Sequence, residues 1–515
     1  MLGLQHAVVV APNLAIIVLV ARATGASADA IASLISCSLL ALAATTCLQS
    51  SLRTGSGFFI VSCTSGIYVS ASLAAAVGGL PLVSGMTLLA GLVQVLFAQA
   101  LVRLRRFFPN ELIAVSVMVV GLELGAIGLQ RISTNGNLGL VVGALTFLVS
   151  VTLGVYGRGS LKLYCALLGV VFGYFASVFA GLAAPEFLSE ALSGPVFGMP
   201  SPPDFRFDFR GEYLLPFAFA AVAASLKTMG AVVISDQMND TAWVRPNIRL
   251  VRKAVSVDGL GTALSGLLGG FGTNSNTASI GVARATGATS RSIGYSVAAW
   301  MVLFAFSPAF VHLFVAMPDA VIGGTLLFVA CMVTVNGLQL LGTVTMDMRR
   351  SAVLAFPLIL AMAKIGNAPP FNLVPESLKP YFASALAIAV IAALLTNALY
   401  TLGVTRRATL VFEPSITPLE RLALVRKILD DWKVAQNVKA RATLTLRELF
   451  DENASSIRLR FNGCTLDFDL TRNAADVPKH QSPGEGQFFS DRVCDGISRR
   501  KGRNASEVFS AYYEQ

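Results

Sequence analysis

Residues 272–291 read GTNSNTASIGVARATGATSR, and almost every side chain in this stretch is small and polar. The rest of the 515-residue chain is the opposite, because 54% of all residues are apolar and only 13% are charged. A mean hydropathy of +0.68 lies far outside the range of soluble globular domains and indicates an integral membrane protein. A polar stretch inside such a chain needs a structural explanation.

Apolar runs long enough to cross a bilayer recur to about residue 403, so they are not a signal peptide. Hydropathy predicts about fourteen spans, at residues 4–21, 30–49, 57–77, 81–101, 110–129, 138–156, 163–182, 213–235, 254–271, 273–290, 292–314, 320–341, 352–366 and 380–403. The basic clusters all follow even-numbered spans; they are Arg53, Arg103, Arg105, Arg106, Arg158, Lys162, Arg245, Arg249, Arg252, Lys253, Arg291, Arg349, Arg350, Arg406 and Arg407. This pattern predicts a plasma (inner) membrane protein with both termini in the cytoplasm. The net charge of +10 then reflects topology and contact with anionic membrane lipids, not binding of nucleic acid.

The polar stretch lies in the tenth predicted span, and a second interruption, SGFFIVSCTSGIYVS at 56–70, lies in the third. These are equivalent positions in two halves of seven spans. Paired interruptions in inverted repeats indicate a binding site near the bilayer midplane, where half-helices direct N–H groups toward a ligand. We therefore expect residues 62–68 and 273–281 to be extended and to meet between half-helices, because lipid cannot satisfy irregular backbone. The alternative is a small-residue surface that allows close helix packing.

Five stretches carry a resemblance to a known family. They are GLQH at 3–6, FFPNELIAVSVMVVGLELGAIGL at 107–129, VDGLGTALSGLLGGFGTN at 257–274, SIGVARATGATSRSIGY at 279–295 and FSPAFVHLFVAMPDAVIGGTLLFV at 306–329. They resemble the nucleobase-ascorbate transporters, or type 2 nucleobase:cation symporters, which include xanthine and uracil permeases. The resemblance covers residues 1–403 and implies an α-helical membrane protein with a 7+7 inverted repeat. It also implies a core domain of spans 1–4 and 8–11, a gate domain of spans 5–7 and 12–14, and a homodimer.

The resemblance indicates where the substrate binds, and this chain departs from the family there. Lys227 in SLKTMGA stands where the eighth span of the family has a glutamate that hydrogen-bonds the nucleobase. Ala278 and Ser279 replace a Gln or Glu and an Asn of the signature, and Ser65, Gly66 and Ile67 replace Ser-Phe-Ala in the third span. The implied substrate-binding residues are Lys227, Ser65, Gly66, Tyr68, Thr277, Ala278, Ser279 and Gly281. Losing such hydrogen-bonding partners predicts a different substrate class, because sites of this kind reject analogues steeply.

Three of the ionisable residues within the predicted spans are candidates for a functional role. Lys227 either faces the site and favours an anionic substrate, or snorkels or forms a structural ion pair with Asp236 or Asp258. Glu123, in the fifth span, is a candidate coupling or gating residue and a candidate partner of Lys227 before substrate binds. His6 is the other coupling candidate, because imidazole titrates near neutral pH, although the resemblance favours a structural role.

The composition changes abruptly after residue 404. Residues 421–456 are charged with a helical period, and IRLRFNG and CTLDFDLT alternate like the two strands of a hairpin. Residues 404–515 therefore predict a small cytoplasmic α+β domain with a regulatory or interaction role.

Two functions from different classes fit these features. The first is a secondary active transporter, a symporter with proton or sodium as coupling ion, for a nucleobase-like or other small organic anion such as urate or xanthine. It would work by alternating access of the core domain against the gate domain. The second is a transporter-derived membrane sensor that signals through the C-terminal domain. We expect no enzyme, cofactor or metal, because the three histidines and seven scattered cysteines show no catalytic or metal-ligand spacing.

Overall fold

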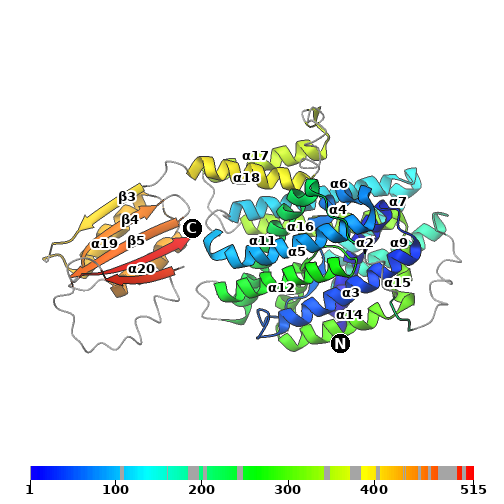
Figure 1. The fold of residues 1–515 in the computed structure, drawn as a ribbon, viewed down its shortest axis with the longest axis horizontal. Helices are drawn as coiled ribbons and strands as arrows, with labels where there is room; N and C mark the ends of the chain where they lie inside the picture. Colours follow the sequence, from blue (N-terminus) through cyan, green and yellow to red (C-terminus); the bar gives the residue numbers. More distant parts are fainter. Residues whose placement is uncertain are drawn as a thin grey trace.

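The computed structural model shows a bundle of long helices up to residue 401, followed by a small region of strands and helices (Figure 1). The structure describes residues 2–104, 110–158, 160–183, 197–200, 206–240, 247–341, 348–369, 371, 384–401, 406–413, 415–432, 434, 436–449, 454–461, 465–473, 496–501 and 506–514. This architecture confirms the predicted fold class, a helical membrane protein with a small α+β region at its C-terminal end.

Each predicted span coincides with one helix or with a short group of elements. In the first half these are α1 (Leu2–Val10), η1 (Ala11–Asn13) and α2 (Leu14–Ala23); α3 (Ala28–Ser50); β1 (Ser62–Thr64), η2 (Gly66–Tyr68), α4 (Val69–Ala75) and η3 (Ala76–Gly78); α5 (Gly79–Leu104); α6 (Asn110–Ser133); α7 (Gly136–Tyr156); and α8 (Ser160–Leu163) with α9 (Cys165–Phe179). In the second half they are η5 (Gly211–Tyr213) and α11 (Leu214–Asn239); α12 (Ile248–Leu267); β2 (Thr273–Ser275) and α13 (Thr277–Thr286); α14 (Arg291–Ala305) and α15 (Pro308–Val315); α16 (Asp319–Leu341); α17 (Met348–Ile365); and α18 (Ala385–Thr401).

Many of these helices suit a bilayer. Within the described residues, seven are long and apolar enough to cross a membrane, or eight if α14 and α15, which meet at a bend of 77°, count as one span. The bend lies where Ser307 accepts a hydrogen bond from Phe310 N–H and Pro308 begins α15. Helix α7 leaves a row of apolar side chains exposed, including Leu138, Val141 and Leu148, as expected of a helix that faces lipid.

The two polar interruptions meet as a pair of antiparallel strands. Ser62 pairs with Ser275, Cys63 with Asn274, and Thr64 with Thr273. The expectation that both interruptions are extended and meet is confirmed at these residues, but its extent is wrong. Residues 66–68 already form η2 and residues 277–281 already lie in α13. A helical turn satisfies its own backbone, so only the residues that pair across the crossing need to be extended.

Glycines bring neighbouring helices into close contact elsewhere in the bundle. A Cβ at Gly259 of α12 would lie 2.8 Å from the backbone nitrogen of Val95 in α5. A Cβ at Gly323 of α16 would lie 2.6 Å from the carbonyl oxygen of Gly128 in α6. The α5–α12 pair belongs to the predicted core and the α6–α16 pair to the predicted gate. Packing through small residues therefore holds helix pairs together, while the polar interruptions form a separate structure.

The C-terminal region has its own hydrophobic core. Its strands, β3 (Arg406–Val411), β4 (Ala454–Phe461), β5 (Thr465–Asn473), β6 (Gly496–Lys501) and β7 (Ser506–Glu514), form an antiparallel sheet in the order β3-β4-β5-β7-β6. Helices α19 (Pro418–Asp431) and α20 (Gln436–Leu449) pack against this sheet through buried apolar side chains. The predicted hairpin of β4 and β5 is confirmed.

The first helix of this region begins with a capping box. The Thr417 side chain accepts a hydrogen bond from Glu420 N–H, and the Glu420 carboxylate accepts from the backbone and hydroxyl of Thr417. These hydrogen bonds lower the pKa of Glu420. The local sequence therefore sets where α19 starts, without help from distant residues.

Candidate functional site

The candidate site is built around the β1–β2 crossing. Two further backbone hydrogen bonds extend the strand pair: Ser65 N–H donates to the Gly272 carbonyl oxygen at 2.9 Å, and Asn276 N–H donates to the Val61 carbonyl oxygen at 2.7 Å. Directly after these bonds the chain enters η2 and α4 on one side and α13 on the other. Helix α11 packs against both η2 and β2, so it forms a third wall of the crossing.

A buried carboxylate fixes this crossing in place. Asp258 of α12 accepts hydrogen bonds from Gln49 Nε2 at 3.2 Å, from Ser275 N–H at 3.1 Å, from Ser275 Oγ at 2.9 Å and from the Thr228 hydroxyl. These donors belong to α3, β2 and α11. Because a buried charge is tolerated only when it is fully hydrogen-bonded, Asp258 is a framework residue that holds four elements together.

Several polar groups at the crossing have no such partner. The side-chain oxygens of Ser62, Thr64 and Ser279, and Asn274 Oδ1, are buried and make no hydrogen bond to any described residue. The Asn274 amide nitrogen, by contrast, donates to the Ala224 carbonyl oxygen in α11 at 2.8 Å. Buried polar atoms without partners are rare and call for a specific explanation. A polar ligand or water at the crossing would supply the missing hydrogen bonds.

Lys227 lies on α11, next to Thr228, which binds Asp258. Helix α11 packs against β2, so Lys227 lies on a helix that borders the strand pair. Lys227 is half-buried, and it makes neither an ion pair nor a hydrogen bond to any described residue. The structural ion pair with Asp236 or Asp258, an alternative in the sequence analysis, is therefore not formed within the described part of the chain.

Gly66 and Tyr68, two predicted substrate-binding residues of the first interruption, lie in different environments. A Cβ at Gly66 would lie 3.3 Å from Leu124 Cδ2 of α6, so this glycine faces the predicted gate. Tyr68 is only 1% exposed; its hydroxyl donates to Gln94 Oε1 at 3.2 Å, and its ring lies where a Cβ at Gly272 would be. Tyr68 therefore packs inside the predicted core, an environment that favours a structural role for its side chain over the predicted substrate contact.

The remaining predicted residues of the second interruption lie in α13. Thr277 Oγ1 accepts a hydrogen bond from Asn336 Nδ2 of α16 at 2.8 Å, which joins predicted core to predicted gate. Gly281 borders open space, because a Cβ there would meet no atom within 4 Å. Ala278 occupies the first turn of α13, next to the buried Ser279. Ser65, at 2% exposed, caps η2 by accepting a hydrogen bond from Ile67 N–H.

Glu123 does not contact Lys227. Its carboxylate accepts a hydrogen bond from Ala385 N–H, the first residue of α18, at 3.2 Å. The Ser70 hydroxyl of α4 also reaches this carboxylate and lies 2.8 Å from the Ser384 hydroxyl. Glu123 thus stabilises a helix N-terminus within the predicted gate and touches the predicted core at Ser70. The structure does not form the suggested Glu123–Lys227 pair.

His6 is fully buried in α1, and its ring meets the Phe59 ring edge-on at a centroid distance of 4.7 Å. Neither of its nitrogens hydrogen-bonds to a described residue. This environment favours the packing role over the coupling role.

Sequence reasoning missed Asn336, Ser70 and Ser384, which make polar contacts between the two predicted domains near the crossing. Asn336 carried a readable signal, because an amide within an otherwise apolar span is rare and marks a functional or helix-joining position. Within the described residues, no group of three His, Cys, Asp or Glu side chains is placed to hold a metal ion.

Comparison with known proteins identifies the family. Residues 1–367 of this chain match the family model of the xanthine/uracil permeases, which is described as a permease family. The chain is 23% identical to the nucleobase transporter PlUacP of Paenibacillus larvae over 424 residues, covering 78% of this chain and 94% of that protein. It is 25% identical to the uric acid transporter UacT of Escherichia coli over 435 residues, covering 80% and 88%.

Among solved structures, the transmembrane domain of the cyanobacterial bicarbonate transporter BicA aligns with a TM-score of 0.48 at 18% identity, covering 77% of this chain and 96% of that one. The family match spans most of the chain and agrees with the resemblance seen in the sequence. The chain is therefore an integral multi-pass membrane permease, not an enzyme, and it belongs to the xanthine/uracil permease family.

Proposed function

We propose that this permease is a secondary active transporter of a small anionic, nucleobase-like compound such as urate or xanthine. The observation that carries the proposal is Lys227 on α11, a helix that packs against the strand crossing, with no ion pair or hydrogen bond to any described residue. A charge at membrane depth is expensive unless it faces a cavity or a ligand. The relatives named as nucleobase and uric acid transporters support the same class of substrate.

The substrate would bind between Lys227 and the first turn of α13. The N-terminus of a helix carries about half a positive charge, so α13 and Lys227 would act on the same anion. The buried oxygens of Ser279 and Thr64 make no hydrogen bond within the described part of the chain and would accept hydrogen bonds from N–H groups of a nucleobase ring. Gly66 leaves room on the side that faces α6.

Transport would proceed by movement of a core domain, spans 1–4 and 8–11, against a gate domain, spans 5–7 and 12–14, within residues 1–403. Near the site, polar contacts join the two domains: Thr277 with Asn336, and Ser70 with Ser384. These polar contacts can break and re-form when the domains move, alongside apolar packing that includes Ile67 and Leu124. We further propose that the working unit is a homodimer in lipid.

We propose a proton as the coupling ion and Glu123 as its carrier. Glu123 sits at the boundary of the two domains; among the described residues its hydrogen-bond donors are neutral, and Lys364 is the cation that acts on it electrostatically. An anion bound at the crossing would favour the neutral, protonated carboxyl through charge repulsion, and a protonated Glu123 would favour the anion in return. Substrate and proton would then move together.

Uptake into proteoliposomes tests the proposal directly. With the purified full-length chain, an inward proton gradient should drive accumulation of labelled urate or xanthine, and an uncoupler should abolish it. Uracil and bicarbonate serve as comparison substrates. Accumulation of no purine above protein-free liposomes, under any gradient, would refute the transport function.

A membrane sensor that signals through residues 404–515 is the second candidate. One observation favours it: the described residues of the C-terminal region form a hydrophobic cluster of their own, which includes no residue of a membrane helix. The sensor proposal predicts that urate binds to the full chain without uptake. Removal of residues 404–515 would leave uptake intact if that region regulates transport, whereas a pure sensor would show none with either form.

The proposed topology makes a separate prediction. Thr409 in β3 and Asn135 between α6 and α7 are both exposed, and the distribution of basic residues puts Thr409 inside and Asn135 outside. In intact cells a membrane-impermeant thiol reagent should label Asn135→Cys and not Thr409→Cys, and permeabilisation should expose both. The unsubstituted chain measures background from native cysteines. Labelling of Thr409→Cys in intact cells would reverse the topology.

A further inference from the structure

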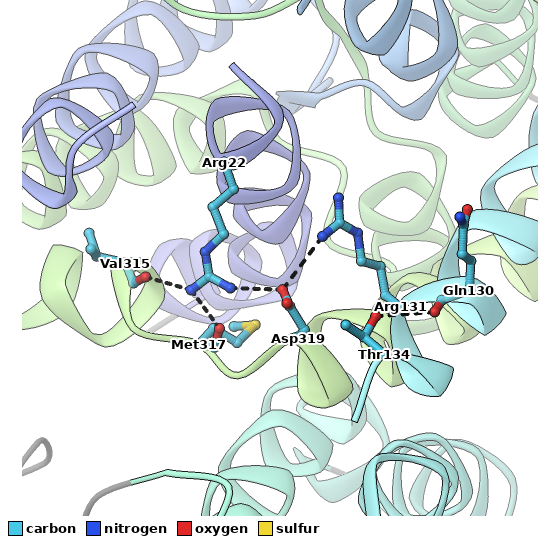
Figure 2. A network of polar contacts seen from close by, with 7 residues as sticks. All are labelled: Arg22, Gln130, Arg131, Thr134, Val315, Met317 and Asp319. Carbon is cyan, nitrogen blue, oxygen red and sulfur yellow. Dashed lines mark hydrogen bonds and ion pairs between the residues drawn. The ribbon is translucent and has the colours of Figure 1, made fainter. Parts of the chain in front are cut away.

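A charged cluster joins the ends of three helices (Figure 2). The pattern of basic residues predicts that this end of the bundle lies opposite the cytoplasmic face. Arg22, in the last turn of α2, donates through one terminal nitrogen to Asp319 Oδ1 at 2.8 Å. Its other terminal nitrogen donates to the carbonyl oxygens of Val315 at 2.9 Å and Met317 at 2.8 Å. Arg131, in the last turn of α6, lies 3.8 Å from the same Asp319 oxygen.

The position of this cluster gives it a mechanical meaning that rests on the proposed core and gate domains. Helices α2 and α15 belong to the proposed core, and α6 and α16 to the proposed gate. Residues 316–318 connect α15 to α16, and Met317 in this connection is fully buried. The guanidinium group of Arg22 therefore bonds to the end of α15 in the proposed core, to the connection at residues 316–318, and to the first residue of α16 in the proposed gate.

The ion pair between Arg22 and Asp319 can form and break reversibly. Arg22 neutralises carbonyl groups at the C-terminal end of α15, and Asp319 lies at the positive N-terminal end of α16, so both charges suit their helices. Their side chains are 29% and 27% exposed, so water reaches the pair and weakens it. Two arginines also share one carboxylate, which leaves Asp319 a second partner on its own side of the boundary.

We propose that the cluster is an exchange clasp that controls opening on this side of the protein. When core and gate are together, Asp319 holds Arg22. When the core moves away, Asp319 passes to Arg131, which moves with the gate. The exchange replaces one ion pair by another, so opening does not leave Asp319 unpaired. Arg22 sets the stability of the closed arrangement, and Arg131 keeps the barrier to opening low.

The first test asks whether Arg22 and Asp319 must separate during transport. The double variant Arg22→Cys/Asp319→Cys is joined by a short, reducible bifunctional thiol reagent and compared with each single variant treated alike. Joining should stop proton-driven urate uptake, and reduction should restore it. Joined protein that still transports at the rate of reduced protein would overturn the clasp. Wild-type liposomes in the same experiment report on transport itself, so the two proposals fail separately.

The second test isolates the exchange partner. Arg131→Gln should lower the maximal uptake rate about two- to fivefold, the range expected for one partly exposed ion pair, with little change in the substrate concentration at half-maximal uptake. Arg210→Gln is the matched control, because its partner Asp208, at 3.1 Å, lies on the same segment and cannot be separated from it by domain movement. Equal rates for Arg131→Gln and Arg210→Gln would show that Arg131 takes no part.

Discussion

Replacing Lys227 with glutamine is expected to weaken the binding of an anionic substrate about tenfold or more. Two unit charges about 4 Å apart attract by only about 1 kcal/mol in bulk water, but by about 4 kcal/mol at the effective dielectric near a protein surface. Because Lys227 is half-buried, we expect the loss of binding free energy to lie near the lower of these two values, at about 1.4 kcal/mol. This loss corresponds to a tenfold change in affinity. Titration calorimetry with urate would measure it.

Two further variants make this result specific. Lys227→Arg keeps the charge and should retain most of the affinity. Lys253→Gln removes a half-buried lysine that donates to the Leu52 carbonyl oxygen, so the same substitution outside the site should have no effect. If Lys227→Gln binds urate as tightly as Lys253→Gln does, Lys227 is a snorkelling lysine and the anionic substrate loses its main support.

The spans were predictable from the sequence because bilayer thickness dictates their length and composition. The location of the strand crossing was predictable for a related reason: polar residues such as Asn274 and Ser275 are too costly in lipid without a structural role. The length of the strand crossing was not predictable. Ser65 caps a helical turn immediately after β1, and a local hydrogen bond of this kind has little effect on the hydropathy pattern.

Contacts between residues that lie far apart along the chain could not be predicted from the sequence. Glu123 was recognisable as a carboxylate within a span, but its hydrogen-bond donor, Ala385 N–H, lies 262 residues away. Arg22 and Asp319 are 297 residues apart, and each resembles an ordinary charge at the end of a span. Tyr68 was assigned to the substrate site from the resemblance alone, whereas its direction depends on Gly272 and Gln94. Tertiary packing decides such contacts, and periodicity carries no information about them.

Replacing Glu123 with glutamine is expected to abolish proton-driven accumulation while leaving substrate exchange intact. The amide has nearly the shape of a protonated carboxyl group and still accepts a hydrogen bond from Ala385 N–H, but it cannot bind or release a proton. For a proton-coupled anion transporter, acidifying the outside raises the fraction of carriers that hold both proton and anion, so wild-type uptake should rise as external pH falls. Glu123→Gln behaves as if permanently protonated, and its uptake should not respond to external pH.

The measurement compares initial urate uptake in acidic and neutral external buffer with counterflow exchange in liposomes preloaded with unlabelled urate. Glu123→Asp should recover part of the pH response, because the carboxylate is restored on a shorter side chain. Glu212→Gln, a substitution of the same kind beside the start of α11 and away from the crossing, should behave as wild type. A Glu123→Gln protein whose uptake still rises on acidification would place the proton elsewhere. Loss of exchange together with accumulation would instead make Glu123 a structural cap of α18.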